Sequence, residues 1–137
     1  MARRYILAVI LIFFAWTVFD FIIHAAALER MYASLSHLWR PVAEMNAALI
    51  NVVRLVESAA FAAIFALLVA PKNLVSGLKY GLLFGIAAGV PMGLGAYAFM
   101  PVPLSLGIAW SLGVLAEAAA GGLILGALFG QEKRPAK

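Results

Sequence analysis

The chain has no cysteine and few charged residues. Of its 137 residues, 12% are Asp, Glu, Lys or Arg, whereas 66% are hydrophobic. Without cysteine there is no disulfide framework, no thiolate metal site and no cysteine nucleophile. With so little charge, the chain cannot give a soluble domain a polar surface. The mean hydropathy of +1.04 therefore indicates an integral membrane protein, with residues 1–137 forming a single transmembrane domain.

The sequence also lacks catalytic and nucleotide-binding motifs. No serine lies in a nucleophile elbow, and the glycines do not form the G-x-G-x-x-G pattern that follows a strand. The formal net charge of +4 is carried near the ends of apolar runs, where the positive-inside rule accounts for it. We therefore expect a non-enzymatic protein whose partners include membrane lipids and exclude nucleic acid.

Four apolar segments are long enough to cross a membrane. A helix needs about 20 residues for a hydrocarbon core of about 30 Å. The first segment follows Arg3 and Arg4 as a signal peptide would, but its apolar run is longer than a signal core, so we expect a retained span. The sequence predicts an all-α bundle of four transmembrane helices. The expected spans are residues 5–28, 44–70, 76–99 and 104–130.

Prolines and aromatic residues mark the connections. Residues 29–40 combine an apolar stripe with polar residues, which predicts an amphipathic segment lying in the membrane interface between the first two spans. An irregular loop is the alternative. Pro41 suits the first turn of the second helix, and Pro91 should kink the third because it removes a backbone hydrogen bond. The expected interfacial anchors are Tyr32, Trp39 and Arg40.

Lysine and arginine predict the orientation. Seven of them fall at the N-terminus, in the region of residues 72–79 or in the C-terminal tail, against Arg30 and Arg40 on the opposite side. The positive-inside rule then places both termini in the cytoplasm, as an even number of spans requires. The seven are Arg3, Arg4, Lys72, Lys79, Lys133, Arg134 and Lys137.

Two ladders of small residues predict close helix packing. Small residues four apart give a helix a face that another helix can approach closely in lipid, so we expect the third and fourth spans to pair through a glycine zipper. Four steps of four residues drift by about 160° around a helix. The ends of the first ladder should therefore meet different neighbours, making the third span the shared packing partner of the bundle. The ladders are Gly77, Gly81, Gly85, Gly89 and Gly93, and Ala118, Gly122, Gly126 and Gly130.

Polar side chains within the spans form a candidate site. If each span is centred in the bilayer, Glu57 and Glu117 lie near the midplane, with the others up to about two helical turns outward. Charges at that depth cost about 2.5–3.5 kcal/mol each, so they should face the interior and pair. Three carboxyl groups face one arginine, so a proton, a cation or a partner's basic residue should complete the balance. The candidates are Asp20, His24, Asn51, Arg54, Glu57 and Glu117.

Several interpretations of this site stay open. Arg54 can form a structural pair with Asp20 or Glu57, or the group can carry a proton or a cation. It can also form a polar pocket for the headgroup of a bound lipid or quinone. Asp20 and His24 at i, i+4 are weak candidates for a metal site with a glutamate as third ligand, and a lone histidine can in principle bind haem. No cofactor is predicted; a bound lipid or quinone is the alternative.

One further pattern is a resemblance. It comprises Leu38-Trp39-Arg40-Pro41-x-x-Glu44-Met45, with Asp20-x3-His24 before it and Lys79-Tyr80-Gly81, Pro101-x-Pro103 and Ala109-Trp110 after it. In these residues the chain resembles a group of small, uncharacterised bacterial proteins with four transmembrane helices. The resemblance implies a bacterial inner-membrane location and supports the four-span count, and it brings no activity with it.

The glycine ladders carry the functional prediction. They exceed what four short helices need among themselves, which favours an accessory or assembly subunit of a larger membrane complex, or a homo-oligomer. One alternative is a small proton- or cation-linked transporter or channel that uses the polar site. Another is a lipid- or quinone-binding membrane protein.

Overall fold

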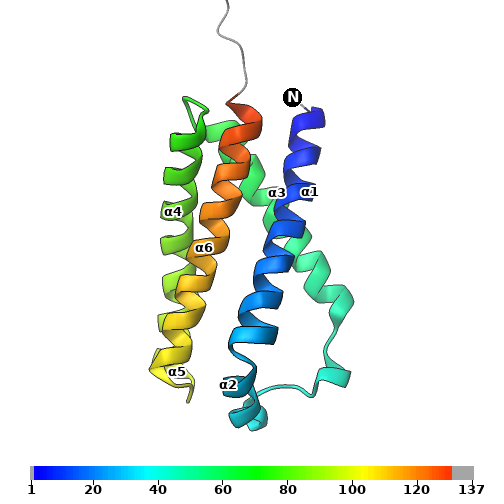
Figure 1. Ribbon diagram of the computed structural model, residues 1–137, viewed down its shortest axis with the longest axis vertical. Helices are drawn as coiled ribbons and strands as arrows, with labels where there is room; N and C mark the ends of the chain where they lie inside the picture. The colour runs from blue at the N-terminus through cyan, green and yellow to red at the C-terminus, as the bar shows by residue number, and fades with distance from the viewer. Residues whose placement is uncertain (1, 131–137) are drawn as a thin grey trace, which may run out of the picture.

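The computed structural model describes residues 2–130, and 87% of them are helical. No strand occurs in this range. Four helices are long and apolar enough to cross a membrane, and they run up and down beside one another (Figure 1). The all-α class and the four helices of spanning length are therefore confirmed. These four helices are Ala2–Ala27, Ala47–Leu68, Leu74–Phe99 and Leu104–Phe129.

Two of the four helices change their winding partway. The first consists of α1 (Ala2–Asp20) and the π-helix η1 (Phe21–Ala27). The third consists of α4 (Leu74–Val90), the π-helix η4 (Pro91–Gly95) and α5 (Ala96–Phe99). Proline has no N–H, and its ring crowds the carbonyl four residues earlier, so the third helix widens at Pro91. The expected disturbance at Pro91 is thus a π-turn within a continuous helix.

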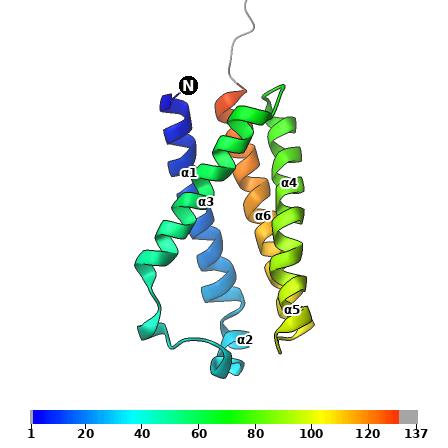
Figure 2. The same ribbon diagram turned by 180° about the vertical axis from the view of Figure 1, so that it is seen from behind.

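The long connection between the first two spans consists of short helices. These are α2 (Glu29–Ser34), η2 (Ser36–Leu38) and η3 (Val42–Glu44), and α3 (Ala47–Leu68) follows. The expectation that Pro41 opens the second long helix is wrong. Asn46 caps that helix instead, since its Oδ1 accepts the Leu49 backbone N–H at 2.9 Å and satisfies one of the free donors of the first turn. The chain then swings away from the α4–α6 side before α3 begins (Figure 2).

The closest helix pair is α4 with α6 (Leu104–Phe129), which lie side by side in both views (Figures 1 and 2). A Cβ atom added at Gly85 would lie 2.8 Å from the Cα of Leu115, and one at Gly77 would lie 2.9 Å from the Cα of Gly126. Both separations are too short for a side chain, so the backbones touch. The five glycines of the first ladder are buried, as are Gly122 and Gly126, whereas Gly130 follows the end of α6 and is exposed.

The expected divergence of the first ladder is wrong. All five glycines face α6, from Gly77 against Gly126 to Gly93 against Gly107. A repeat longer than 3.6 residues keeps facing one partner when the two helices coil around each other, and the wide turn of η4 reduces the drift before Gly93. The shared packing partner is α6 rather than α4, because α6 packs against α1, α3 and α4.

Large apolar side chains fill the bundle from its middle to the end where the described chain begins and ends. Trp16 of α1, Phe61 and Phe65 of α3, and Phe129 of α6 are at most 2% exposed. Hydrogen bonds tie the helices together here, since Trp16 Nε1 donates to the Glu117 carbonyl at 2.6 Å. This end of the bundle is therefore closed by packed side chains. Lys133, Arg134 and Lys137, on which the predicted orientation partly depends, lie outside the described residues.

Candidate functional site

The polar side chains converge on Arg54 in the middle of the bundle. Its Nη2 forms an ion pair with Oδ2 of Asp20, the last residue of α1. Its Nη1 lies 3.8 Å from Oε2 of Glu117, in the middle of α6. We call Asp20, Arg54 and Glu117 the Arg54 cluster. The structure thus contains one of the two ion pairs that the sequence suggested for Arg54, the one with Asp20.

The Arg54 guanidinium keeps a free hydrogen-bond donor. Its side chain is only 15% exposed, and Nη1 is buried without an acceptor within residues 2–130. The 3.8 Å to Glu117 exceeds the length of a hydrogen bond. A buried donor without a partner costs about 1–3 kcal/mol. This nitrogen can therefore bind a small polar ligand or, after a slight rotation, Glu117.

A small cavity lies beside the cluster. Its volume is about 70 Å³, which suffices for a few water molecules or a small cation. Both π-helices reach it, η1 with Ile23 and His24 and η4 with Met92, and π-turns of this kind are frequent at functional sites. The rest of the lining consists of the Arg54 cluster, Glu57, Trp110, Gly113 and Val114.

His24 links the cluster to α2. Its Nε2 lies 3.6 Å from Oδ1 of Asp20, and its Nδ1 lies 2.5 Å from the Tyr32 hydroxyl oxygen. Trp110 of α6 donates its Nε1–H to the same hydroxyl oxygen at 2.6 Å. The polar contacts therefore form a chain from Trp110 through Tyr32, His24 and Asp20 to Arg54.

Aromatic packing holds Tyr32 in place. Its ring stacks on His24, with centroids 5.8 Å apart, and meets Trp39 edge-on at 5.7 Å. Burial raises the pKa of the Tyr32 hydroxyl above its ordinary value; the Trp110 hydrogen bond opposes this shift and the nearby Asp20 charge adds to it. Tyr32 therefore carries its proton throughout the neutral range and can donate it. Tyr32 and Trp39, expected at the lipid interface, turn toward the bundle, whereas Arg40 is exposed.

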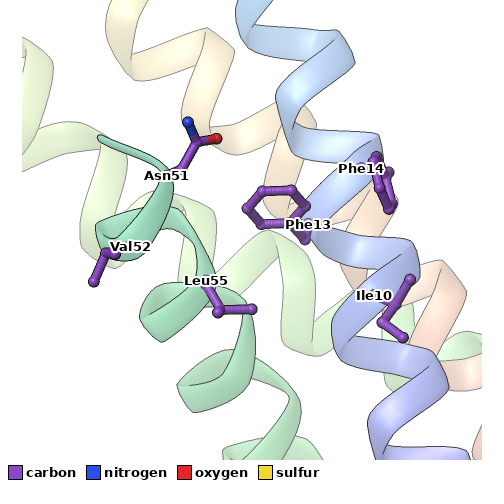
Figure 3. A pocket seen from close by; sticks show the side chains of 6 residues that line it. All are labelled: Ile10, Phe13, Phe14, Asn51, Val52 and Leu55. Atoms are coloured by element: carbon purple, nitrogen blue, oxygen red, sulfur yellow. The ribbon is translucent and has the colours of Figure 1, made fainter. Parts of the chain in front are cut away.

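The structure does not bring Asn51 to the cluster. Its amide donates to the Ala47 carbonyl of its own helix at 2.8 Å. It lines a separate cavity of about 290 Å³ between α1 and α3, which is otherwise apolar (Figure 3). The five other lining residues are Ile10, Phe13, Phe14, Val52 and Leu55. Glu57 does line the small cavity, but as an exposed residue at its edge.

The metal alternative lacks a ligand set in the described part of the chain. Asp20 and His24 are close to each other, but no group of three His, Asp or Glu side chains there can hold a metal ion. His37, the second histidine, is exposed in η2. Neither histidine is thus part of a chelating group in residues 2–130.

The sequence interpretation missed Trp110, although a signal for it was present. Trp110, Gly113, Val114 and Glu117 follow one another at spacings of three, one and three residues, so they share a face of α6. Gly113 leaves room for η1, because a Cβ added there would lie 3.1 Å from Cδ1 of Ile23. A periodicity search outward from Glu117 identifies this face without a structure.

Comparisons with protein-family models, with curated proteins and with solved structures gave no match for this chain. Over residues 2–130, the fold and the site define a helical protein with four helices of spanning length and a partly buried ionic cluster. The resemblance to small bacterial membrane proteins stays a prediction, and the function has to be argued from geometry.

Proposed function

We propose that this is a small multi-pass protein of the bacterial inner membrane that binds a proton or a small cation at the Arg54 cluster and transports it. In this proposal both termini are cytoplasmic, and the segment of α2 and η2 lies in the interface on the opposite side. The proposal is supported by four helices of spanning length with partly buried charges between them, since charged groups within such spans mark ion or proton sites by default.

The observation that carries the proposal is a polar cavity of about 70 Å³ in the bundle, lined by Asp20, His24, Arg54 and Glu117. On the α2 side, His24 lies at its edge with a side chain that is 39% exposed. On the side of the termini, Trp16, Phe61 and Phe65 fill the space. Carriers that alternate their access have their sites near mid-membrane beside interrupted helices, and this cavity lies beside the π-helices η1 and η4. The packed aromatic side chains do not suit an open channel.

The charges favour a cation over an anion. Asp20 and Glu117 are in the cluster and Glu57 is at its edge, whereas Arg54 is the guanidinium that faces them. The carboxyl groups therefore outnumber the guanidinium by two. A proton or a small cation reduces this imbalance, while an anionic headgroup increases it.

The other two predicted functions receive less support. The glycine ladders were the reason to expect a partner subunit, but the α4–α6 contact within the chain buries all of their glycines except Gly130. A cavity of about 70 Å³ is well below the roughly 300–1,000 Å³ of ordinary ligand pockets. A quinone headgroup therefore does not fit the charged site. The larger apolar cavity around Asn51 suits a lipid chain.

Transport assays with purified protein in lipid vesicles test the proposal. Proton flux is followed with a dye trapped inside, and cation flux with radioactive sodium or potassium. Flux through wild-type protein should fall to that of empty vesicles in Glu117→Gln, because this carboxyl group is buried beside Arg54. Glu44→Gln, in the exposed η3, is the matched control and should transport normally. Equal flux in wild type and Glu117→Gln would contradict the proposal.

A further inference from the structure

The hydroxyl group of Tyr32 has two hydrogen-bond partners with different chemistry. Trp110 Nε1 can only donate, so the Tyr32 oxygen accepts from it at 2.6 Å. Among the described residues, the other hydrogen-bond partner of this hydroxyl group is Nδ1 of His24, at 2.5 Å, so the hydroxyl hydrogen has an acceptor there only when Nδ1 bears no hydrogen. A neutral imidazole accepts only at the nitrogen that bears no hydrogen. The tautomer that gives the Tyr32 hydrogen an acceptor is the one in which neutral His24 carries its own hydrogen on Nε2.

This tautomer gives the two nitrogens of His24 separate roles. The Nε2–H faces Oδ1 of Asp20 at 3.6 Å, a gap that a small side-chain movement closes. The lone pair of Nδ1 faces α2, through Tyr32. The other carboxylate oxygen of Asp20 binds Arg54. Asp20 thus lies between His24 and Arg54, and its negative charge can stabilise a positive charge on either of them.

We propose that His24 Nδ1 is the proton-accepting atom at the α2 side of the cluster, and that Tyr32, held by Trp110, is the positioning residue that fixes the tautomer. Its role in transport rests on the proposed function, whereas the tautomer can be measured independently. On uptake, the Tyr32 O–H bond breaks as the Nδ1–H bond forms, and the Tyr32 oxygen regains a proton from a hydronium ion, which becomes water. The net change is one proton moved from the hydronium ion onto His24.

The charged groups around His24 determine how this proton is held. Asp20 on the first helix stabilises the imidazolium, and Arg54 on α3 opposes it. Glu57 and Glu117 line the same cavity and favour the imidazolium when they are ionised, while Tyr32 stays neutral. A charged His24 competes with Arg54 for Asp20, so uptake should move Arg54 toward Glu117. Proton binding at the edge is thereby coupled to the centre of the cluster.

Nitrogen NMR of the histidine rings tests the tautomer directly. The chain has two histidines, so protein labelled with ¹⁵N-histidine in lipid nanodiscs shows two rings, and His37→Gln assigns them. Above the His24 titration, wild type should show a protonated Nε2 and a bare Nδ1. In Tyr32→Phe this preference should be lost, giving a mixture of tautomers and a shifted His24 titration. Tyr97→Phe, in the exposed part of α5, is the control and should match wild type.

Two results would overturn the inference. One is a wild-type His24 that carries its hydrogen on Nδ1, and the other is a Tyr32→Phe spectrum identical to wild type. If Tyr32→Phe does not fold, Trp110→Phe keeps the hydroxyl and removes only its donor; the His24 tautomer signal should then broaden or split. The NMR signals do not depend on transport. A wrong tautomer would therefore contradict this inference alone, whereas equal flux in wild type and Glu117→Gln would contradict the proposed function.

Discussion

The α4–α6 contact and the α1–α3 contact join helices by opposite means. In the first, glycines bring two backbones together along the full length of α4 and η4. In the second, long side chains bridge the gap, as Tyr5 does to the Ala59 carbonyl and Arg54 to Asp20. The second contact also borders the cavities of about 290 and 70 Å³. Close-packed backbones have one arrangement, whereas helices spaced by side chains can move between several. The mobile part of a transport cycle is therefore expected in α1 and α3.

The largest expected effect follows from removing the charge that joins α1 and α3. Arg54→Met leaves Asp20 and Glu117 without their cation in the bundle interior. Breaking a buried ion pair by removing one partner costs about 3–5 kcal/mol of the free energy of unfolding. Unfolding in mixed detergent micelles, followed by circular dichroism, measures this loss.

A second substitution shows whether Arg54→Met destabilises the protein by removing the ion pair or by leaving the Asp20 charge without a partner. Arg54→Met combined with Asp20→Asn removes one uncompensated carboxylate, so the double variant should regain part of the lost stability. Arg40→Met, outside the four long helices and exposed, controls for the loss of a positive charge. A double variant as unstable as Arg54→Met would show that the charge of Asp20 is not what makes the single substitution costly.

A smaller effect is expected where backbones touch. Gly81→Ala adds a Cβ atom 2.9 Å from the Cα of Ala119. Since overpacking costs about 1–3 kcal/mol, α4 and α6 should separate slightly and the free energy of unfolding should fall by that amount. Gly95→Ala is the matched control. Outside the adjacent helix backbone, the nearest atom to the added Cβ would be the Val90 carbonyl oxygen, at 4.0 Å, so the methyl group has room. Equal losses in the two variants would mean that the glycine contact is not close-packed.

The two contacts also differ in how far the sequence predicts them. The pairing of α4 with α6 follows from glycine spacing, since small residues four apart leave a face that another helix can approach. The glycine spacing does not predict that the whole ladder contacts one partner. The expected drift of the glycines around the helix was calculated for a straight helix, whereas two packed helices coil around each other. On the other side, the cost of an isolated charge predicts that Arg54 has an acidic partner, but it does not choose Asp20 over Glu57.

The part of the site around Tyr32 could not be predicted in this way. Tyr32 lies in a connection, and its direction depends on tertiary packing: Leu28, Val102 and Leu106 form a small apolar cluster against which α2 folds back. No local pattern in residues 29–40 distinguishes a tyrosine that faces lipid from one that faces His24. Asn51 shows the reverse case, since helical spacing places it near the face of Arg54, while the structure places its side chain in the separate cavity between α1 and α3 (Figure 3).

The smallest expected effect follows from removing single hydrogen bonds to α3, and it tests whether α3 is less stably packed than α6. Tyr5 and Tyr80 each donate to a carbonyl of α3, at 2.9 Å to Ala59 and 2.8 Å to Phe61. Tyr5→Phe and Tyr80→Phe should each lower the free energy of unfolding by about 0.5–1.5 kcal/mol. Hydrogen exchange should show faster exchange in α3 for both, with α6 unchanged. If α6 amides exchange faster instead, the glycine contact depends on α3, and the division into a rigid pair and a movable pair fails.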